Sequence, residues 1–221
     1  ARSPRVMSGP ARRDLAVPMR DGTLLRADLW LPDPEAHPGP RPALICRTPY
    51  GKGRDAGELR FAARAADRGY AVLLQDVRGR YASGGVFAPH ETEGADGHDT
   101  IEWVAAQDWC DGRLGTFGLS YPGCAQWLAA LMRPPHLKAM APAMSYARLV
   151  DCIYYGGVFD ADWLRWGVVS MAPDERARRG LPGPQTEPEA WEDWQTRPEA
   201  AREGFLPLAD LPDLEITPYV R

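Results

Sequence analysis

One serine stands where the chain could carry out nucleophilic chemistry. Ser120 follows the apolar run Leu114–Leu119 and precedes a segment of helical character that opens at Tyr121. A serine on a sharp turn between a buried strand and a helix is held away from the backbone at the end of a sheet. Its hydroxyl can attack a carbonyl carbon once a neighbouring base takes its proton. The segment therefore predicts acyl-transfer chemistry at Ser120.

Two glycines flank this turn. Gly118 gives room for a strained turn, and Gly123 lets the new helix pack close to the strand. The strict pattern places the second glycine two residues after the serine, where this chain has Pro122. Proline is tolerated there because the first turn of a helix has no intrahelical partner for its N–H. The turn is typical of the nucleophile elbow of α/β-hydrolases.

Two groups are candidates for stabilising the negative charge on the attacked carbonyl oxygen. The backbone N–H of Tyr121 lies at the predicted helix N-terminus, where the helix dipole favours negative charge. Tyr50 lies in the loop after the apolar run Ala43–Cys46, the region from which α/β-hydrolases draw their other oxyanion donor. A surface aromatic residue in a Pro-Tyr-Gly turn is the alternative for Tyr50.

The general base is harder to place. In α/β-hydrolases the order along the chain is serine, acid, histidine. His136 is the only histidine after Ser120; no Asp or Glu lies between them, and a surface loop is predicted at His136. The other histidines precede the serine and break the order: His37, His90 and His98. The sequence thus predicts a nucleophile and an oxyanion hole without an acid–base pair.

Two further polar groups are open to a functional interpretation. Asp76 and Arg78 leave a predicted strand at its C-terminal end, where ligands bind in such sheets, but we favour an ion pair that braces the loop. The segment from His90 to Asp99 is rich in His, Asp and Glu, yet its spacing fits no metal-ligand template. We predict neither a metal site nor a cofactor.

The elements that position Ser120 follow from apolar patterning. A hairpin of Ala16–Met19 with Leu24–Leu31 is followed by short buried strands and helices. The predicted strands are Ala43–Cys46, Tyr70–Leu74, Leu114–Leu119 and Leu137–Ala143, and the helices are Leu59–Arg68, Asp99–Gln107 with Asp96 or Asp99 as its cap, and Tyr121–Met132. This alternation predicts an α/β fold with a mostly parallel sheet and helices on both faces.

Several motifs together resemble the X-Pro dipeptidyl-peptidase and cocaine esterase family of serine hydrolases. They cover about residues 14–170 in order. The motifs are Val17–Thr23, Arg47–Tyr50, Gln75–Gly79, Ser83 with Gly85 and Phe87, Asp96 and Gly97 through Ile101–Trp103, and Gly118–Gly123. In this family the second glycine stands three residues after the nucleophile, which Gly123 matches.

The resemblance implies site residues. Ser120 would be the nucleophile, the Tyr50 hydroxyl and the Tyr121 N–H would form the oxyanion hole, and Trp166 would line an acyl pocket. The family supplies its catalytic Asp and His after a helical cap, from the last strands of the sheet. The change in composition along the chain, together with the resemblance, predicts a flexible lead-in over 1–13, the first part of an α/β-hydrolase core over 14–146 and a helical cap domain over 147–221. The C-terminal part of the fold is expected to lie outside the chain.

The cap region is rich in tryptophan, proline and arginine. Helices are predicted over Val158–Met171 and Glu189–Arg202, followed by a proline-punctuated loop. Trp163 and Trp166, with Tyr154 and Tyr155, favour a bulky or aromatic acyl group, and core packing is the alternative. Three acidic residues could recognise a substrate amine, although solvated faces are the interpretation we favour: Asp151, Asp160 and Asp162.

Composition limits the function classes. A net charge of -4 argues against a nucleic-acid role. No apolar run approaches the roughly 20 residues that span a membrane, and the polar, basic start predicts no signal peptide. Four scattered cysteines predict reduced, mostly buried thiols and a cytoplasmic protein, with a disulfide as the alternative.

These observations lead to two hypotheses for the function. The first is a serine hydrolase of small-molecule esters or amides that acts through an acyl-enzyme on Ser120. In that case the 221 residues are an N-terminal fragment without the triad Asp and His, and alone they are inactive. The second is a non-catalytic fragment or pseudoenzyme that binds ligands or assembles with another polypeptide. Both hypotheses are compatible with a homo-oligomer or with association of this chain with the missing C-terminal part.

Overall fold

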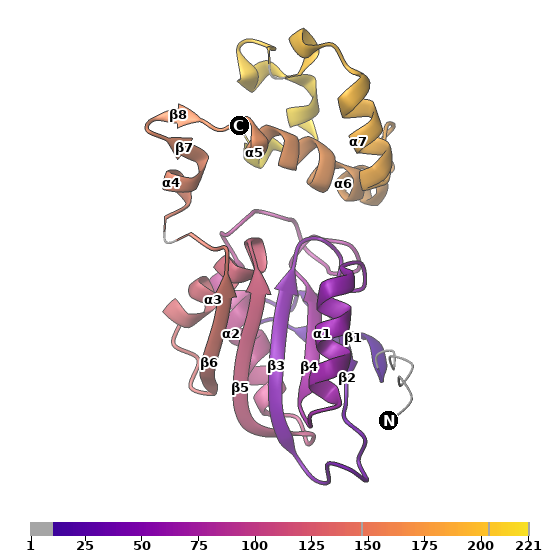
Figure 1. The fold of residues 1–221 in the computed structure, drawn as a ribbon, viewed down its shortest axis with the longest axis vertical. Coiled ribbons are helices and arrows are strands. Elements are labelled where there is room, and N and C mark those ends of the chain that lie inside the picture. Colours follow the sequence, from indigo (N-terminus) through magenta and orange to yellow (C-terminus); the bar gives the residue numbers. More distant parts are fainter. Residues whose placement is uncertain (1–10, 147, 203, 221) are drawn as a thin grey trace, which may run out of the picture. The chain divides into compact units, whose positions relative to one another are not determined.

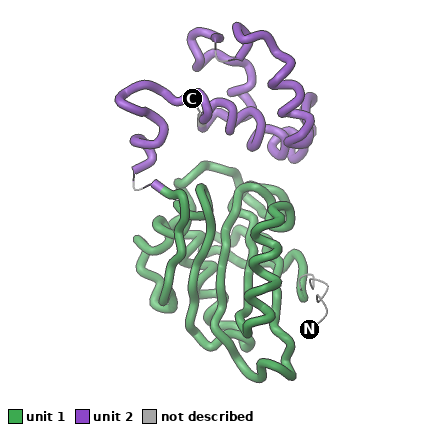
Figure 2. Tube along the Cα trace, viewed as in Figure 1, with its two compact units in different colours: residues 1–145 green, residues 146–221 purple. Residues whose placement is uncertain are grey.

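A computed structural model describes residues 11–146, 148–202 and 204–220 of the chain. The chain divides into two compact units, Ala1–Ser145 and Tyr146–Arg221 (Figure 2). No helix within the described ranges is both long and apolar enough to cross a membrane.

The first unit is built on a six-stranded sheet with the order β1-β2-β4-β3-β5-β6 (Figure 1). The strands are β1 (Arg12–Pro18), β2 (Leu24–Trp30), β3 (Arg41–Thr48), β4 (Ala71–Asp76), β5 (Cys110–Leu119) and β6 (Leu137–Ala143). β1 and β2 join the sheet antiparallel, whereas β4, β3, β5 and β6 run parallel. The predicted mostly parallel sheet is confirmed. The carboxyl ends of the four parallel strands therefore share one edge.

Helices cover both faces of this sheet, as predicted. On one face, α1 (Ala56–Ala66) buries Ala62 and Ala65 against Val72 and Leu74 of β4. On the other face lie α2 (Glu93–Ala105) and α3 (Tyr121–Leu131), which bury Ile101, Val104 and Ala129 in a second cluster. β4 is buried along its whole length because it lies between these two layers.

The predicted flexible lead-in is wrong at its C-terminal end. β1 begins at Arg12, which pairs with Leu29, and the register shifts between Arg12 and Leu15, where Asp14 has a φ of 51°. The side chains of Arg12, Arg13 and Asp14 are exposed. Backbone pairing and polar contacts such as that of Lys52 with Asp14, at 2.7 Å, hold this end of the strand, so no apolar alternation marks it in the sequence. Residues 1–10 lie outside the described ranges.

The second helix starts six residues before the predicted Asp99. It begins at Glu93, and its first turns bury the acidic side chains of Glu93 and Asp96. A Cβ on Gly97 would lie 2.6 Å from the Cβ of Ala129, so α2 packs against α3 at a glycine. Glycines and buried carboxylates give a weak helix signal, and only the packing of these two helices reveals the first turns.

The second unit is mainly helical but more broken than predicted. After α4 (Leu149–Ile153) come a small hairpin of β7 (Tyr154–Tyr155) and β8 (Val158–Phe159), then α5 (Asp162–Arg165), a π-helical turn (Trp166–Met171), α6 (Ala172–Arg179) and α7 (Glu187–Thr196). The single helix predicted over Val158–Met171 is therefore wrong. Gly156 and Gly157 both have positive φ, which turns the chain into the hairpin before α5 begins.

Short turns of 3-10 helix complete the second unit. One covers Glu199–Ala201, so the segment predicted as one or two helices contains α7 and this turn. Three more interrupt the predicted proline-punctuated loop: Leu208–Asp210, Pro212–Glu215 and Pro218–Val220. The core of the unit gathers Leu164, Val168, Trp194 and Leu211.

Candidate active site

Ser120 occupies a strained position at the shared carboxyl edge of the parallel strands. It follows β5, caps α3, and has φ 63° and ψ −121°. A positive φ is uncommon for a residue with a side chain, and such strain persists only where the surroundings hold it. The Ser120 N–H donates to the carbonyl of Ala143 at the end of β6, at 2.9 Å. The turn has the geometry of a nucleophile elbow.

The glycines flanking Ser120 have the roles that the sequence predicts. Gly118 has a φ of 146°, and a Cβ on it would lie 2.4 Å from the Cβ of Pro122. A Cβ on Gly123 would lie 2.8 Å from the carbonyl oxygen of Ala143. Pro122 stands in the first turn of α3, where no intrahelical bond is lost. Both glycines therefore permit close approaches that a side chain would block.

The Gln126 side chain braces the elbow from within α3. Its amide nitrogen donates to the carbonyls of Gly118, at 3.3 Å, and Pro122, at 3.1 Å. Its amide oxygen accepts from the Ala141 N–H and the Thr116 hydroxyl, both at 3.1 Å. The sequence does not indicate this role, since a glutamine inside an apolar helix gives no sign of which carbonyls its side chain reaches.

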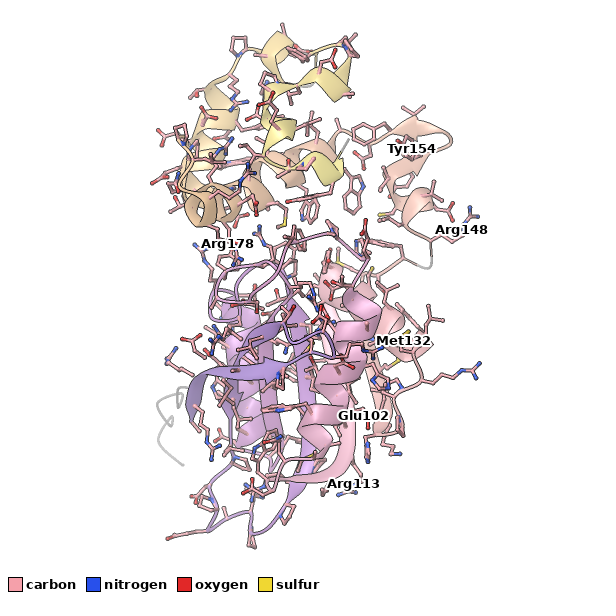
Figure 3. All side chains as sticks on the ribbon, turned by 180° about the vertical axis from the view of Figure 1, so that it is seen from behind. Glu102, Arg113, Met132, Arg148, Tyr154 and Arg178 are labelled. Carbon is pink, nitrogen blue, oxygen red and sulfur yellow. The ribbon has the colours of Figure 1, made fainter. Side chains whose placement is uncertain are left out.

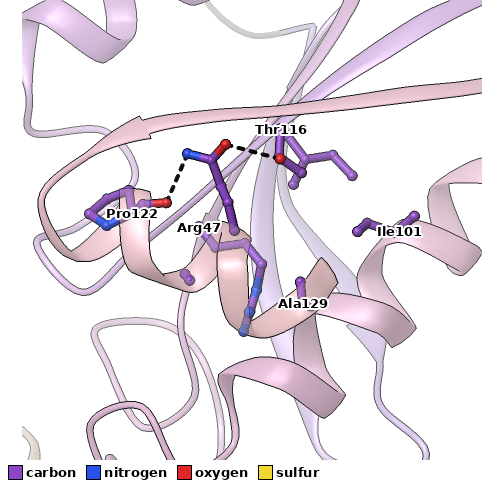
Figure 4. A pocket seen from close by; sticks show the side chains of 9 residues that line it. Arg47, Ile101, Thr116, Pro122 and Ala129 are labelled. Carbon is purple, nitrogen blue, oxygen red and sulfur yellow. Dashed lines mark hydrogen bonds between the residues drawn. The ribbon is translucent and has the colours of Figure 1, made fainter. Parts of the chain in front are cut away.

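The gap around Gln126 is a narrow internal pocket (Figure 4). Side chains of β3, β5, α2 and α3 line it, among them Arg47, Ile101, Thr116 and Ala129. These residues belong to the layer between the sheet and the helices. The pocket thus belongs to the packing behind the elbow, and we do not assign substrate to it.

Tyr50 lies in the loop that follows β3, the strand next to the elbow strand. Ile45 of β3 pairs with Thr116 of β5, and the same register places Thr48, the last residue of β3, beside Leu119. The loops that carry Tyr50 and Ser120 therefore leave adjacent strands at the same edge. Tyr50 is half-buried.

Three hydrogen bonds pin the backbone around Tyr50. The Tyr50 N–H donates to the Thr48 hydroxyl at 3.2 Å, and the Lys52 N–H donates to an Asp76 carboxylate oxygen at 2.7 Å. The carbonyl of Pro49 accepts from Nε of Arg80, at 2.9 Å, and Arg80 is fully buried. Such a loop is preorganised, as an oxyanion donor needs to be.

Asp76 and Arg78 make the bracing contacts that the sequence analysis favoured. The Lys52 ammonium lies 3.4 Å from Asp76. The Arg78 guanidinium pairs with Asp21 at 2.7 Å and with Asp96 at 2.6 Å. These hydrogen-bonded pairs raise the pKa of Arg78 and lower the pKa of Asp21. Arg78 thus ties the β1–β2 turn to α2.

His136 lies at the amino ends of the parallel strands, whereas Ser120 lies at their carboxyl ends. His136 precedes β6, and its carbonyl accepts from the Leu114 N–H at 3.1 Å. The run from Leu114 to Ser120 spans about 20 Å at about 3.3 Å per residue. The Nδ1 atom of His136 lies 2.7 Å from a carboxylate oxygen of Glu102. In Figure 3 the label of Glu102 lies between those of Met132 and Arg113.

His90 is placed beside the elbow helix, which the sequence did not indicate. Its ring stacks on Tyr121 with centroids 4.5 Å apart, and its backbone N–H donates to the Tyr121 hydroxyl at 3.1 Å. Burial lowers the pKa of His90 to about 4, so the ring is neutral at pH 7 and a weak base. The other two histidines lie elsewhere, His98 against Arg20 and Asp99, and His37 in the loop before β3.

Comparison with known proteins now identifies the family. The family model described as X-Pro dipeptidyl-peptidase (S15 family) matches residues 21–209, most of the chain. The chain belongs to the S15 family.

Two proteins of similar sequence are esterases by name. A cocaine esterase from Rhodococcus sp. (strain MB1 Bresler) is 43% identical over 150 residues, covering 65% of this chain and 25% of that protein. A putative serine esterase from Mycobacterium bovis is 29% identical over 188 residues, covering 76% of this chain and 30% of its own length. The chain spans about a quarter to a third of the length of these relatives.

A solved structure shows the same fold. The CocE/NonD family hydrolase from Staphylococcus aureus superposes with a TM-score of 0.65 at 27% identity, covering 76% of this chain and 33% of that one. The sheet of the S15 chain is thus of the α/β-hydrolase kind, as the sequence analysis expected, and the chain matches only part of such a hydrolase.

In the second unit of this S15 chain the predicted pocket tryptophans pack together. The ring centroids of Trp163 and Trp166 are 5.7 Å apart, and Trp166 lies 6.4 Å from Tyr219, both edge to face. The Trp163 indole N–H donates to the Cys152 carbonyl at 3.1 Å. Both tryptophans are half-buried, whereas Tyr154 is exposed. Trp166 also opens the π-helical turn, a feature often found at functional sites.

The three acidic residues considered for an amine site make ordinary local contacts near the surface of this unit. Asp151 lies 3.5 Å from Arg148, and Asp162 lies 2.9 Å from Arg165. Asp160 accepts from the Asp162 N–H at 3.0 Å. Exposed pairs of this kind are the solvated faces that the sequence analysis favoured over an amine site.

Proposed function

We propose that this chain carries the nucleophile and the oxyanion hole of a serine hydrolase that cleaves esters or amides. The strained backbone of Ser120 at the shared carboxyl edge carries the proposal. Ser120 Oγ attacks the carbonyl carbon and the leaving group departs with a proton, which leaves an acyl-enzyme that water then hydrolyses. The Tyr50 hydroxyl and the Tyr121 N–H stabilise the oxyanion, each contributing roughly 3–4 kcal/mol to the barrier reduction.

The base and its acid partner come, in this proposal, from residues outside these 221. His136 lies at the far edge, and His90 has too low a pKa for efficient proton abstraction near pH 7. β6 pairs only with β5 within the described residues, and Ala139, Ala141 and Ala143 on it are exposed. A further parallel strand beside β6 would deliver an acid or a histidine to the edge that holds Ser120.

The acyl group, in the same proposal, is bulky or aromatic and is held by the domain formed by residues 147–221. Trp166 and Trp163 support this, because their packed, half-buried rings offer an apolar surface next to a π-helical turn. The name of the Rhodococcus relative, a cocaine esterase, agrees with a small-molecule ester as substrate.

The test compares the 221-residue chain with the native gene product. The mass of the native protein should lie far above 24.4 kDa, and that protein should hydrolyse p-nitrophenyl esters with complete loss on Ser120→Ala. The 221-residue chain alone should show no turnover. Ordinary turnover by the short chain would refute the external base, and activity that survives Ser120→Ala would refute the nucleophile. A native product of about 24 kDa without esterase activity would favour the binding or assembly module.

A further inference from the structure

The phenol of Tyr121 is anchored deep in the molecule. Tyr121 is 3% exposed. Its hydroxyl donates to Glu93 Oε1 of α2 at 2.9 Å and accepts from the backbone N–H of His90 at 3.1 Å. Its ring stacks on His90 and makes a tilted contact with Phe87, with centroids 6.1 Å apart. The first residue of α3 is therefore tied to two segments more than 25 residues away in the sequence.

Glu93 is itself fixed to the centre of the sheet. It is 1% exposed, and its carboxylate pairs with Nη1 of Arg47 on β3 at 2.8 Å. Arg47 also donates from Nε to the Gln75 side chain on β4 at 2.9 Å, and from Nη1 to the Glu93 carbonyl at 2.9 Å. Burial raises the pKa of Glu93, and the charge of Arg47 opposes that shift.

A buried ion pair is a poor device for stability alone. The desolvation of two charges offsets most of their attraction, and an apolar pair of the same volume often stabilises as well or better. Hydrogen bonds to charged groups do hold one geometry closely, and Glu93 is held by two of them, its carbonyl accepting from Arg47 and its carboxylate accepting from the Tyr121 phenol, which supports a positioning role at this place.

We propose that Glu93 and Arg47 are positioning residues that act through the Tyr121 phenol on the oxyanion hole. The proposal rests on the function proposed above. The N–H of Tyr121 belongs to the residue that directly follows the strained Ser120, so its direction depends on how the first turn of α3 is held. Gln126 and the Ala143 carbonyl hold this turn from the β6 side, and Glu93 holds it from the β3 side.

The alternative is a purely structural role, in which the network only packs α2 against α3. The two roles predict different effects of a substitution on stability and on catalysis. A loss of packing lowers the unfolding temperature but leaves the folded enzyme active. A displaced N–H weakens binding of the transition state and leaves binding of the ground-state substrate unchanged.

Tyr121→Phe separates them, because it removes the hydroxyl and keeps the ring and the backbone N–H. We expect kcat for a p-nitrophenyl ester to fall about tenfold with KM within about twofold. Inhibition by phenylboronic acid, whose tetrahedral adduct places an oxygen in the oxyanion hole, should weaken by a similar factor. Glu93→Gln, which keeps an acceptor for the phenol, should give an intermediate kcat. Tyr70→Phe, on a partly exposed tyrosine, is the matched control and should change nothing.

The measurements use the polypeptide that has Ser120-dependent esterase activity, with thermal unfolding recorded for each variant. An unchanged kcat and boronate affinity in Tyr121→Phe, with activity still abolished by Ser120→Ala, would overturn the positioning role and leave the hydrolase proposal intact. A rise in KM alone would overturn it as well. Activity that persists in Ser120→Ala would instead overturn the hydrolase proposal itself.

Discussion

Gly118 and Pro122 approach so closely that a Cβ on Gly118 would lie 2.4 Å from the Cβ of Pro122. The φ of Gly118 is 146°, in a region that residues with side chains rarely adopt. The strand therefore meets the first turn of α3 at a point where only glycine fits, and this contact sets the position of Ser120 between them.

Gly118→Ala should destabilise the first unit by on the order of 2–4 kcal/mol, because overpacking adds to backbone strain. Urea unfolding measures the loss. The control is Gly22→Ala, which shares a positive φ of 83° but has nothing within 4 Å of the added Cβ. We expect about 1 kcal/mol there. Equal losses in the two variants would mean that the contact with Pro122 is unimportant.

Arg80→Met should loosen the loop that carries Tyr50. The substitution leaves the Pro49 carbonyl without the buried Arg80 donor and removes the guanidinium packed on Phe87. An unsatisfied buried acceptor and the lost packing predict a loss of about 2–4 kcal/mol in the free energy of unfolding, with faster hydrogen exchange over residues 49–52.

The matched control for that variant is Arg60→Met on the exposed face of α1. We expect a change within about 0.5 kcal/mol and no change in exchange at the loop. If the loop exchanges equally in the Arg80 variant and the wild type, Arg80 does not hold Tyr50.

His136→Gln should leave the reactivity of Ser120 unchanged. The substitution removes only the contact with Glu102, a partly exposed pair at the far edge of the sheet, for at most about 1 kcal/mol. Esterase assays and thermal unfolding of the active polypeptide check both statements. A collapse of kcat with normal stability would make His136 the general base and would contradict the sheet geometry.

The stability of the first unit should depend on pH through Glu58 of α1. Burial, and then the nearby charge of Asp55, raises the pKa of Glu58 from 4.5 to about 7. The native state then holds this proton more tightly than the unfolded chain. The stability that protonated Glu58 contributes to the native state is therefore fully present below about pH 4.5, and it is lost as the pH rises through about 7.

Glu58→Gln should remove this dependence. Compared with wild type, the variant should be more stable by on the order of 1–3 kcal/mol at pH 8 and nearly unchanged at pH 4.5. Urea unfolding at the two pH values gives the difference, and Glu35→Gln on the exposed β2–β3 loop is the control. A constant difference between variant and wild type across this range would show that Glu58 ionises normally.

The parts of the fold that sequence predicts well are those with local causes. Apolar runs such as Ala43–Cys46 and Leu114–Leu119 predict strands between two helix layers, and the parallel sheet is confirmed. The role of Gly118 is also local, since its close contact is with Pro122 of the same turn, whereas Gly123 makes room for the Ala143 carbonyl on the neighbouring strand β6. The first turns of α2 were missed because Glu93 and Asp96 are buried by distant partners.

Local patterns of residues suffice to predict the strand, the strained turn at Ser120 and the family, because turn sterics and motif spacing act over a few residues. The groups that surround that turn follow instead from the packing of distant segments. The order β4-β3-β5-β6 places the Tyr50 loop next to Ser120 and puts His136 at the opposite edge. It also brings Glu93 to Tyr121 across 28 residues. Strand order and helix packing depend on contacts between distant segments, which no local pattern records.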